Sequence, residues 1–237
     1  MKTQIFLIFF AMAILSCSCA DISTVTGNGH TTITKRTVPS YKGISISGGV
    51  DLYITQGDSE KVEVRVDENL QPMIKTEVND GILNVYLARG ILFKMSKARV
   101  NITVKTLSKI SCSGGSDVFT NNMLSVPELS VEASGGSDAK LSIQTEKFNG
   151  NATGGSDIYL KGATKFFDCS ASGGSDIHAK ELMVETAKVD VSGGSDVHLH
   201  ITKQLNASAS GGSDVYYSGN PQLKNVEKSG GSDVIAE

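Results

Sequence analysis

Seven aspartates recur at regular spacing in the second half of the chain, where carboxylates could bind cations or accept hydrogen bonds. Each ends a Gly-Gly-Ser-Asp tetrapeptide, and the seven are Asp117, Asp138, Asp157, Asp176, Asp196, Asp214 and Asp233. If the repeats stack in register ~4.8 Å apart, each neighbouring pair of carboxylates repels by about 3 kcal/mol at an effective dielectric constant of ~20. We expect N–H groups and serine hydroxyls of the turns to offset this repulsion, since aspartate commonly accepts such bonds. The seven residues, called here the aspartate column, are therefore predicted to be structural.

Calcium is the alternative partner for the aspartate column. Hard cations bind carboxylate and carbonyl oxygens, and the tetrapeptide is similar to the glycine-rich calcium repeats of secreted toxins, G-G-x-G-x-D. In this chain the aspartate comes two positions earlier, and the nine-residue half-period of those repeats is missing. We therefore expect no cofactor, with bridging calcium kept as the alternative.

A second column stands two residues after each aspartate, on the outward side of the predicted strand. Its members are Phe119, Lys140, Tyr159, His178, His198, Tyr216 and Ile235. Aromatic and imidazole rings in such a strip could stack on sugar rings or hold a transition metal. We predict Tyr159, His178, His198 and Tyr216 as binding residues and expect no metal site, because the clustered histidines have no nearby cysteine. The alternative is a ladder of cross-strand packing on a solvated face.

Neither thiol chemistry nor catalysis is predicted. Cys112 and Cys169 fall at inward positions three repeats apart, which corresponds to a distance on the order of 14 Å. A disulfide needs Cα atoms within about 7 Å. We therefore expect two buried free thiols. Arginine is absent after Arg99, and an even ladder of carboxylates gives no unique site with a perturbed environment. The chain is therefore not expected to be an enzyme.

The tetrapeptides also predict the elements that position these columns. Successive copies begin 18 to 21 residues apart, and apolar and polar residues alternate before and after each copy. Alternation with period two indicates strands with one buried face, and a repeat of this size indicates a solenoid. We predict an all-β, right-handed parallel β-solenoid with about 19–20 residues per coil, each coil being a strand, a glycine corner, a strand and a variable return segment.

Three segments are predicted along the chain, and the last of them has two parts. Residues 1–20 are a signal segment, residues 21–40 a linker rich in Thr, Ser, Gly and Asn, and residues 41–237 a single solenoid domain. Within that domain, residues 41–107 are expected to form irregular coils and hairpins that cap the solenoid, and residues 108–237 the repeat coils. Ser47-Gly48-Gly49-Val50-Asp51 looks like a degenerate corner, 66 residues before the first full copy, so about three coils are expected between them.

The signal segment predicts export. Ile5–Leu15 is an apolar run of eleven residues after Lys2, which suits an export signal and is short for a membrane span. Ile14-Leu15-Ser16-Cys17 resembles a lipobox, so Cys17, or alternatively Cys19, is predicted to be lipidated. Ordinary cleavage after Ala20 is the alternative. The predicted location is the bacterial cell envelope, at the outer membrane or cell surface, with the membrane as partner through the lipid.

Composition argues against nucleic acid as a partner. The chain has 237 residues, a net charge of −3 and no tryptophan, and aromatic residues make up 6%. A nucleic-acid-binding domain usually carries a basic patch, which this balance of charge does not provide. Few large side chains suit a slim solenoid core of Ala, Val, Ile and Leu.

Residues 41–58, YKGISISGGVDLYITQGD, are followed by Val62-Glu-Val-Arg-Val, Asp80-Gly81-Ile-Leu-Asn-Val and the repeated Ser-Gly-Gly-Ser-Asp corners. Together they resemble the auto-transporter adhesin, head GIN-domain family over about residues 41–237. The resemblance implies an exported bacterial β-solenoid and brings no catalytic residues.

The expected function is a non-catalytic cell-envelope binding or adhesion module that presents a repetitive face to a glycan or an envelope protein. A structural envelope lipoprotein without a specific ligand and a glycan-processing enzyme are the alternatives.

Overall fold

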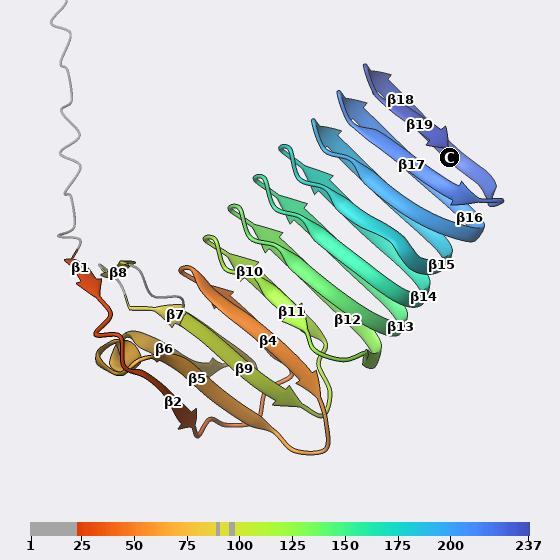
Figure 1. The fold of residues 1–237 in the computed structure, drawn as a ribbon. Coiled ribbons are helices and arrows are strands. Elements are labelled where there is room, and N and C mark those ends of the chain that lie inside the picture. The colour runs from red at the N-terminus through yellow and green to blue at the C-terminus, as the bar shows by residue number, and fades with distance from the viewer. Residues whose placement is uncertain (1–22, 89–90, 95–97) are drawn as a thin grey trace, which may run out of the picture.

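The computed structural model describes residues 23–88, 91–94 and 98–237. It is built almost entirely of strands, which stack as coils along one axis with a barrel-like part at the N-terminal end (Figure 1). The elements are β1 (Ser23–Thr26), β2 (Thr31–Arg36), β3 (Gly43–Ser47), β4 (Val50–Gln56), β5 (Lys61–Asp67), the 3-10 helix η1 (Glu68–Met73), β6 (Ile74–Asn79), β7 (Ile82–Leu87), β8 (Ile91–Lys94), β9 (Ala98–Val104), β10 (Lys109–Ser113), β11 (Val118–Thr120), β12 (Leu124–Ser134), β13 (Ala139–Thr153), β14 (Ile158–Ser172), β15 (Ile177–Gly193), β16 (Val197–Gly211), β17 (Asp214–Gly219), β18 (Gln222–Gly230) and β19 (Asp233–Ala236).

The tetrapeptide repeats form a parallel β-solenoid, which confirms the predicted fold. Each of β12 to β16 pairs in parallel with the next, and equivalent repeat positions face one another, as in Ala133↔Ala152 and Ala152↔Ala171. At a corner, Gly154 has φ +69°, and a Cβ placed there would lie 3.5 Å from the backbone nitrogen of Gly135. The corner therefore needs glycine for its left-handed backbone, while the 3.5 Å approach is an ordinary van der Waals contact.

The return segment of each coil is strand as well. β13 to β16 are 15 to 17 residues long and run from one glycine corner to the next around a smooth bend (Figure 1). The sequence predicted only a variable return segment there. The pairing also slips at this bend, between Tyr159 and Lys161 and between Ala179 and Met183, which breaks the simple count of residues per coil.

The core runs the length of the solenoid between the two sides of each coil. Inward residues such as Val131, Ala171 and Val189 are at most 1% exposed, and the rings of Phe148 and Phe167 stack at 5.4 Å. Small residues before the corner and branched ones after it fill the interior, as their alternation predicts. No coil buries this surface alone, so stacking supplies the stability.

The N-terminal corner lies directly beside the first full repeat. β3 pairs with β10 and β4 with β11, and Gly49 N–H donates to the Gly114 carbonyl at 3.1 Å. The expected three intervening coils are therefore absent at this junction. Instead, β7 and β9 pair in parallel with the opposite edges of β3 and β4, so a coil that comes later in the sequence lies outside the earlier one.

Antiparallel strands complete the N-terminal part. β5 pairs with both β2 and β9, and β6 forms a hairpin with β7. Because β1 and β2 lie in residues 21–40, that predicted linker is partly sheet in the structure. The predicted signal segment, including Cys17 and Cys19, lies outside the described residues. In the part of the chain that the structure describes, no helix is long and apolar enough to cross a membrane.

Candidate functional site

The aspartate column is held by the backbone of the next coil. Each corner aspartate donates its N–H to Oδ1 of the aspartate one coil earlier, at 2.7 Å from Asp233 to Asp214 and 2.8 Å from Asp196 to Asp176. The same contact, at 3.5 Å, reaches Asp51 of the N-terminal corner, which extends the column by one member. These bonds agree with the expectation that corner N–H groups offset the repulsion between carboxylates.

The second oxygen of several carboxylates meets the outward column. The hydroxyl of Tyr159 donates to Asp157 Oδ2 at 3.1 Å, and that of Tyr216 donates to Asp214 Oδ2 at 2.9 Å. Burial raises the pKa of Tyr159, and the carboxylate of Asp157 raises it further. The hydrogen bond to Asp214 raises the pKa of Tyr216. The hydroxyls are therefore held protonated, as donors to the column.

Metal binding gains no support from the arrangement of donor groups. Both carboxylate oxygens of Asp157 and of Asp214 already accept hydrogen bonds. Within residues 23–88, 91–94 and 98–237, no group of three or more His, Cys, Asp or Glu side chains is placed to hold a metal ion. Calcium stays an alternative to be tested by titration.

A column of buried serines lies beside the aspartates and was not anticipated from the sequence. Ser116, Ser137, Ser156, Ser175, Ser195 and Ser213 are 0% exposed. The Oγ of Ser175, for example, accepts the N–H groups of Gly155 at 2.9 Å and Ser156 at 3.1 Å. The sequence feature that could have predicted this column is the serine at the third position of every tetrapeptide. It was overlooked because a polar residue in a glycine turn is normally expected at the surface.

The four predicted binding residues form one continuous stack. Ring centroids are 4.5 Å apart between Tyr159 and His178, 5.6 Å between His178 and His198, and 4.6 Å between His198 and Tyr216. The planes lie within 17° of one another. Repetition thus places one ring per coil at the same outward position, as the spacing predicted.

The stack extends toward the N-terminal part but is broken at one coil. Tyr53 and Phe119 stack at 4.9 Å, and the guanidinium carbon of Arg99 lies 3.4 Å from the centre of the Tyr53 ring. Between Phe119 and Tyr159 the column carries Lys140, whose Nζ is 5.8 Å and 5.2 Å from their ring centres. We call Tyr53, Phe119, Lys140, Tyr159, His178, His198 and Tyr216 the ring column. Tyr53 could have been found from the sequence, because it stands two residues after Asp51 of the degenerate corner.

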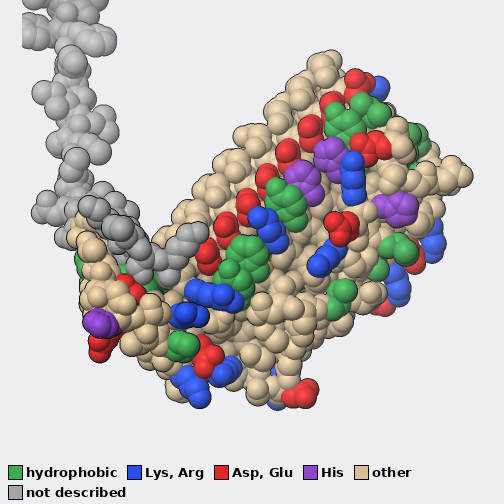
Figure 2. Space-filling model, in the orientation of Figure 1, with side chains coloured by type: hydrophobic (Ala, Val, Ile, Leu, Met, Phe, Trp, Pro, Cys, Tyr) green, Lys and Arg blue, Asp and Glu red, His purple; other side chains and the backbone are tan. Residues whose placement is uncertain are grey.

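Stacking decides which ring surfaces a ligand can reach. Each ring between Tyr159 and Tyr216 covers the face of its neighbour, so the middle of the column presents ring edges to solvent. Within the column, the faces of Phe119 and Tyr159 that border Lys140 meet a flexible side chain instead of another ring. Figure 2 shows this mixed column of hydrophobic, basic and histidine side chains running parallel to a line of acidic ones.

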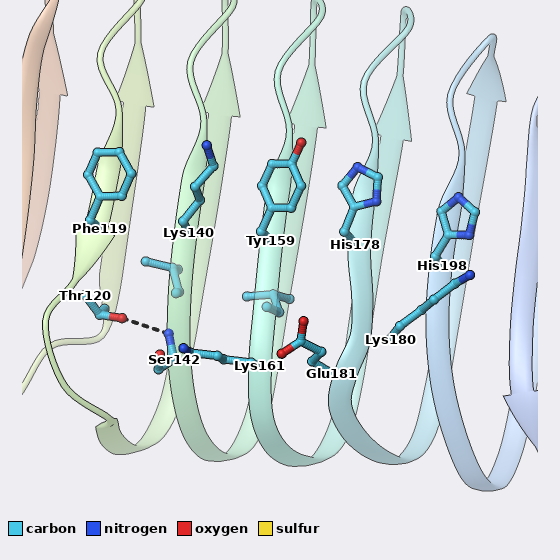
Figure 3. A pocket seen from close by; sticks show the side chains of 12 residues that line it. Phe119, Thr120, Lys140, Ser142, Tyr159, Lys161, His178, Lys180, Glu181 and His198 are labelled. Carbon is cyan, nitrogen blue, oxygen red and sulfur yellow. Dashed lines mark hydrogen bonds between the residues drawn. The ribbon is translucent and has the colours of Figure 1, made fainter.

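A groove of about 420 Å³ lies alongside the ring column. One wall is the ring column from Phe119 to His198, and the other lies near the bend of each coil (Figure 3). The lining residues are Phe119, Thr120, Lys140, Leu141, Ser142, Tyr159, Leu160, Lys161, His178, Lys180, Glu181 and His198. Three of the four predicted binding residues therefore line it, and Tyr216 lies beyond its end. Lys161 was missed although it could have been counted from the sequence, two residues after Tyr159. Glu181 was missed because a slip in register between β14 and β15 hides its alignment with Lys161.

The groove lining carries three lysines against one glutamate. Lys180 pairs with Glu237 at 2.7 Å, and Lys140 lies 3.6 Å from Asp138 Oδ2. Lys161 forms no ion pair with any residue the structure describes within 4.0 Å. Asp138 and Glu237 therefore offset two of the three lysines, and Lys161 is left as the lysine of the groove without an ion pair.

His198 is the titratable ring at one end of the groove. Its Nδ1 is buried and has no hydrogen-bond partner among the described residues. Burial lowers the pKa of His198, and the positive charges of Lys180 and His178 lower it further. The ring is therefore held neutral near pH 7 and packs as an aromatic member of the column.

The two repeat cysteines are buried, as predicted. Cys112 and Cys169 are free thiols in the core. Burial raises the pKa of Cys112 to about 12 and also raises that of Cys169. Thiolate is therefore scarce at neutral pH, and neither group is suited to act as a nucleophile.

The corners, the solenoid and the N-terminal part together match a known family. The model of the family described as "Putative auto-transporter adhesin, head GIN domain" matches residues 40–221. The chain is a head GIN domain protein. This confirms the resemblance read from residues 41–58 and from the repeated corners. No curated protein matches the chain.

Solved structures share the fold of this head GIN domain. A protein from Bacteroides fragilis, described as a putative adhesin, is 21% identical, with a TM-score of 0.85, covering 90% of this chain and 100% of its own. A putative adhesin from Parabacteroides merdae is 23% identical, with a TM-score of 0.71, covering 91% and 100%. A Parabacteroides distasonis protein described as a putative lipid binding protein is 18% identical, with a TM-score of 0.70, covering 90% and 100%. These neighbours carry different descriptions, so they establish the fold of the head GIN domain and leave its ligand to be argued from the site.

Proposed function

We propose that the protein is a non-catalytic binding or adhesion module of the cell envelope, and that the groove beside the ring column binds a glycan. The observation that carries the proposal is the groove itself, which joins aromatic rings and hydrogen-bonding groups over several coils. The family is described as an adhesin, which agrees with an adhesion-like role.

The lining of the groove suits a saccharide. A sugar has apolar C–H faces and a rim of hydroxyls, so its sites combine aromatic surface with a few convergent polar groups. Here Phe119 and Tyr159 supply ring surface, and Ser142, Lys161 and Glu181 supply polar groups across from it (Figure 3). The strand spacing of ~4.8 Å is comparable to the length of one sugar ring, so successive coils would meet successive units of a linear glycan.

The proposed role is binding without turnover. The carboxylates of the aspartate column repeat evenly, and each Oδ1 up to Asp214 accepts the N–H of the next aspartate. A hydrolase or lyase needs carboxylates with unequal environments, and the column does not provide such a pair. A glycan-processing enzyme and a structural lipoprotein without a ligand are the two alternatives.

Envelope anchoring through Cys17, or Cys19, completes the proposal and makes the membrane a partner. An adhesion role needs the groove outside the cell, and the lipobox-like Ile14–Cys17 supplies a route to that location. Metabolic labelling with a fatty acid should mark the wild-type protein and lose the label in Cys17→Ser. Retained label in that variant, and loss in Cys19→Ser, would move the anchor to Cys19.

A glycan array probed with the purified full-length protein tests the binding role. We expect at least one glycan class to be retained, with binding reduced in Tyr159→Ala and His178→Ala proteins whose circular dichroism matches the wild type. Absence of any retained glycan, together with unchanged cell adhesion of both variants, would favour the structural alternative. Release of new reducing ends from any retained polysaccharide would favour the enzyme.

A further inference from the structure

We infer that the ligand of the groove is an acidic saccharide: its ring enters the break in the ring column at Lys140, and its carboxylate or sulfate pairs with Lys140 and Lys161. This inference rests on the proposed glycan-binding role and specifies where and how the glycan is held.

The break at Lys140 has the dimensions of one ring. Lys140 aligns with Phe119 on one side and with Tyr159 on the other, so these two rings stand two strand spacings, ~10 Å, apart. Elsewhere in the column one ring fills each spacing, at 4.5 to 5.6 Å from its neighbour. A ligand ring in the break would therefore lie at ordinary stacking distance from both Phe119 and Tyr159.

Lys140 can leave the break at low cost. Its side chain is 47% exposed, and its contact with Asp138, at 3.6 Å, is the longest of the described ion pairs. A flexible four-carbon stem lets the ammonium swing out and still reach a group at the rim. The ring faces it leaves then become available to the ligand, while the charge stays beside it.

Lys161 supplies a second positive charge at the same place. It aligns with Ser142 on the neighbouring coil, and Figure 3 shows its side chain running toward Ser142, on the coil that carries Lys140. On the other outward face, by contrast, lysines sit in close pairs, such as Lys165 with Glu146 at 2.8 Å and Lys147 with Glu128 at 3.0 Å. Of the three groove lysines, Lys161 is thus the one without an ion pair among the described residues, and an anionic ligand would supply that partner.

The experiment is a glycan array of matched pairs, in which uronate, sialylated and sulfated glycans are each printed beside their neutral parents. Full-length wild-type protein is compared with Lys161→Gln, Lys140→Gln and the control Lys165→Gln, which removes a lysine outside the groove. We expect acidic glycans to bind at least about tenfold more tightly than their neutral parents, because one charge-assisted contact contributes that much. Lys161→Gln should lose about tenfold, and Lys165→Gln should bind like the wild type.

Each other result has a defined meaning. Equal binding of neutral and acidic partners would overturn the acidic ligand while the proposed glycan-binding role stands. If acidic glycans bind Lys140→Gln and Lys161→Gln as tightly as the wild type, the ligand does not lie at the break in the ring column. Absence of binding to every glycan would overturn this inference and the proposed function together.

Discussion

The carboxylate of Asp157 joins two coils and two columns at once. Its Oδ1 accepts the backbone N–H of Asp176 at 3.1 Å, and its Oδ2 accepts the hydroxyl of Tyr159 at 3.1 Å. A row of like charges along one edge is thereby converted into a row of hydrogen-bond acceptors. The same contacts fix the orientation of Tyr159, one of the two rings that border the break in the ring column.

Replacing this carboxylate should show which of its bonds matter. We expect Asp157→Ala to lower the free energy of unfolding by about 1–3 kcal/mol, since it leaves the Asp176 N–H and the Tyr159 hydroxyl without their acceptor. Asp157→Asn should lose less, because the amide oxygen can still accept the N–H and one negative charge is removed from the column. Urea unfolding measures both. An asparagine variant less stable than the alanine variant would contradict a hydrogen-bonding role.

Calcium removal tests the alternative partner of the aspartate column. Because N–H groups and hydroxyls already occupy these oxygens, we predict the same urea midpoint in excess EDTA and in excess calcium. An ion bound to the folded state would instead add about 2.7 kcal/mol at a concentration one hundred times its dissociation constant. A midpoint that rises with calcium and loses this dependence in Asp157→Asn would restore the ion-bridged column.

The buried serines should contribute to stability more than their polarity suggests. In Ser175→Ala, the N–H groups of Gly155 and Ser156 lose their common acceptor inside the corner, at a cost of about 1–3 kcal/mol. Ser170, whose hydroxyl donates to Asn151 at an exposed position, is the matched control. Ser170→Ala should change stability by less than about 0.5 kcal/mol. A loss of stability in Ser175→Ala as small as that in Ser170→Ala would contradict this role of the buried serines.

Stability should fall on acidification through His198. Its folded pKa is lowered by burial and by Lys180 and His178, against weaker opposition from Glu237 and Asp196. The unfolded chain therefore takes up a proton first, near pH 6.5, and stability is lost as the pH falls from there through the folded pKa. His198→Phe keeps a ring in the stack and removes the titration. Its urea midpoint should decline less than that of the wild type between pH 7.5 and 5; an equal decline would assign the effect to other groups.

Contacts between equivalent positions of successive repeats can be predicted from the sequence, whereas contacts between segments far apart in the chain cannot. Within the repeats, counting from each Gly-Gly-Ser-Asp corner places Tyr159, His178, His198 and Tyr216 in one stack, because every coil has the same outward position. That Gly48 lies beside Gly114 cannot be predicted by counting residues, because the strands between them in the sequence pair with the opposite edges of β3 and β4. Likewise, Glu181 aligns with Lys161 through a slip in register between β14 and β15 that no local pattern predicts, whereas Lys161 follows the regular alternation two residues after Tyr159.

Filling the break in the ring column is the most direct test of ligand entry there. Lys140→Phe supplies the missing ring, so it should raise the free energy of unfolding by about 0.5–1.5 kcal/mol through stacking with Phe119 and Tyr159. The same ring should exclude the ligand. Titration with the acidic glycans retained on the array is predicted to show binding at least about tenfold weaker than wild type, and weaker than in Lys140→Gln, which removes only the charge. A stable Lys140→Phe protein that binds those glycans as tightly as the wild type would contradict binding at the break.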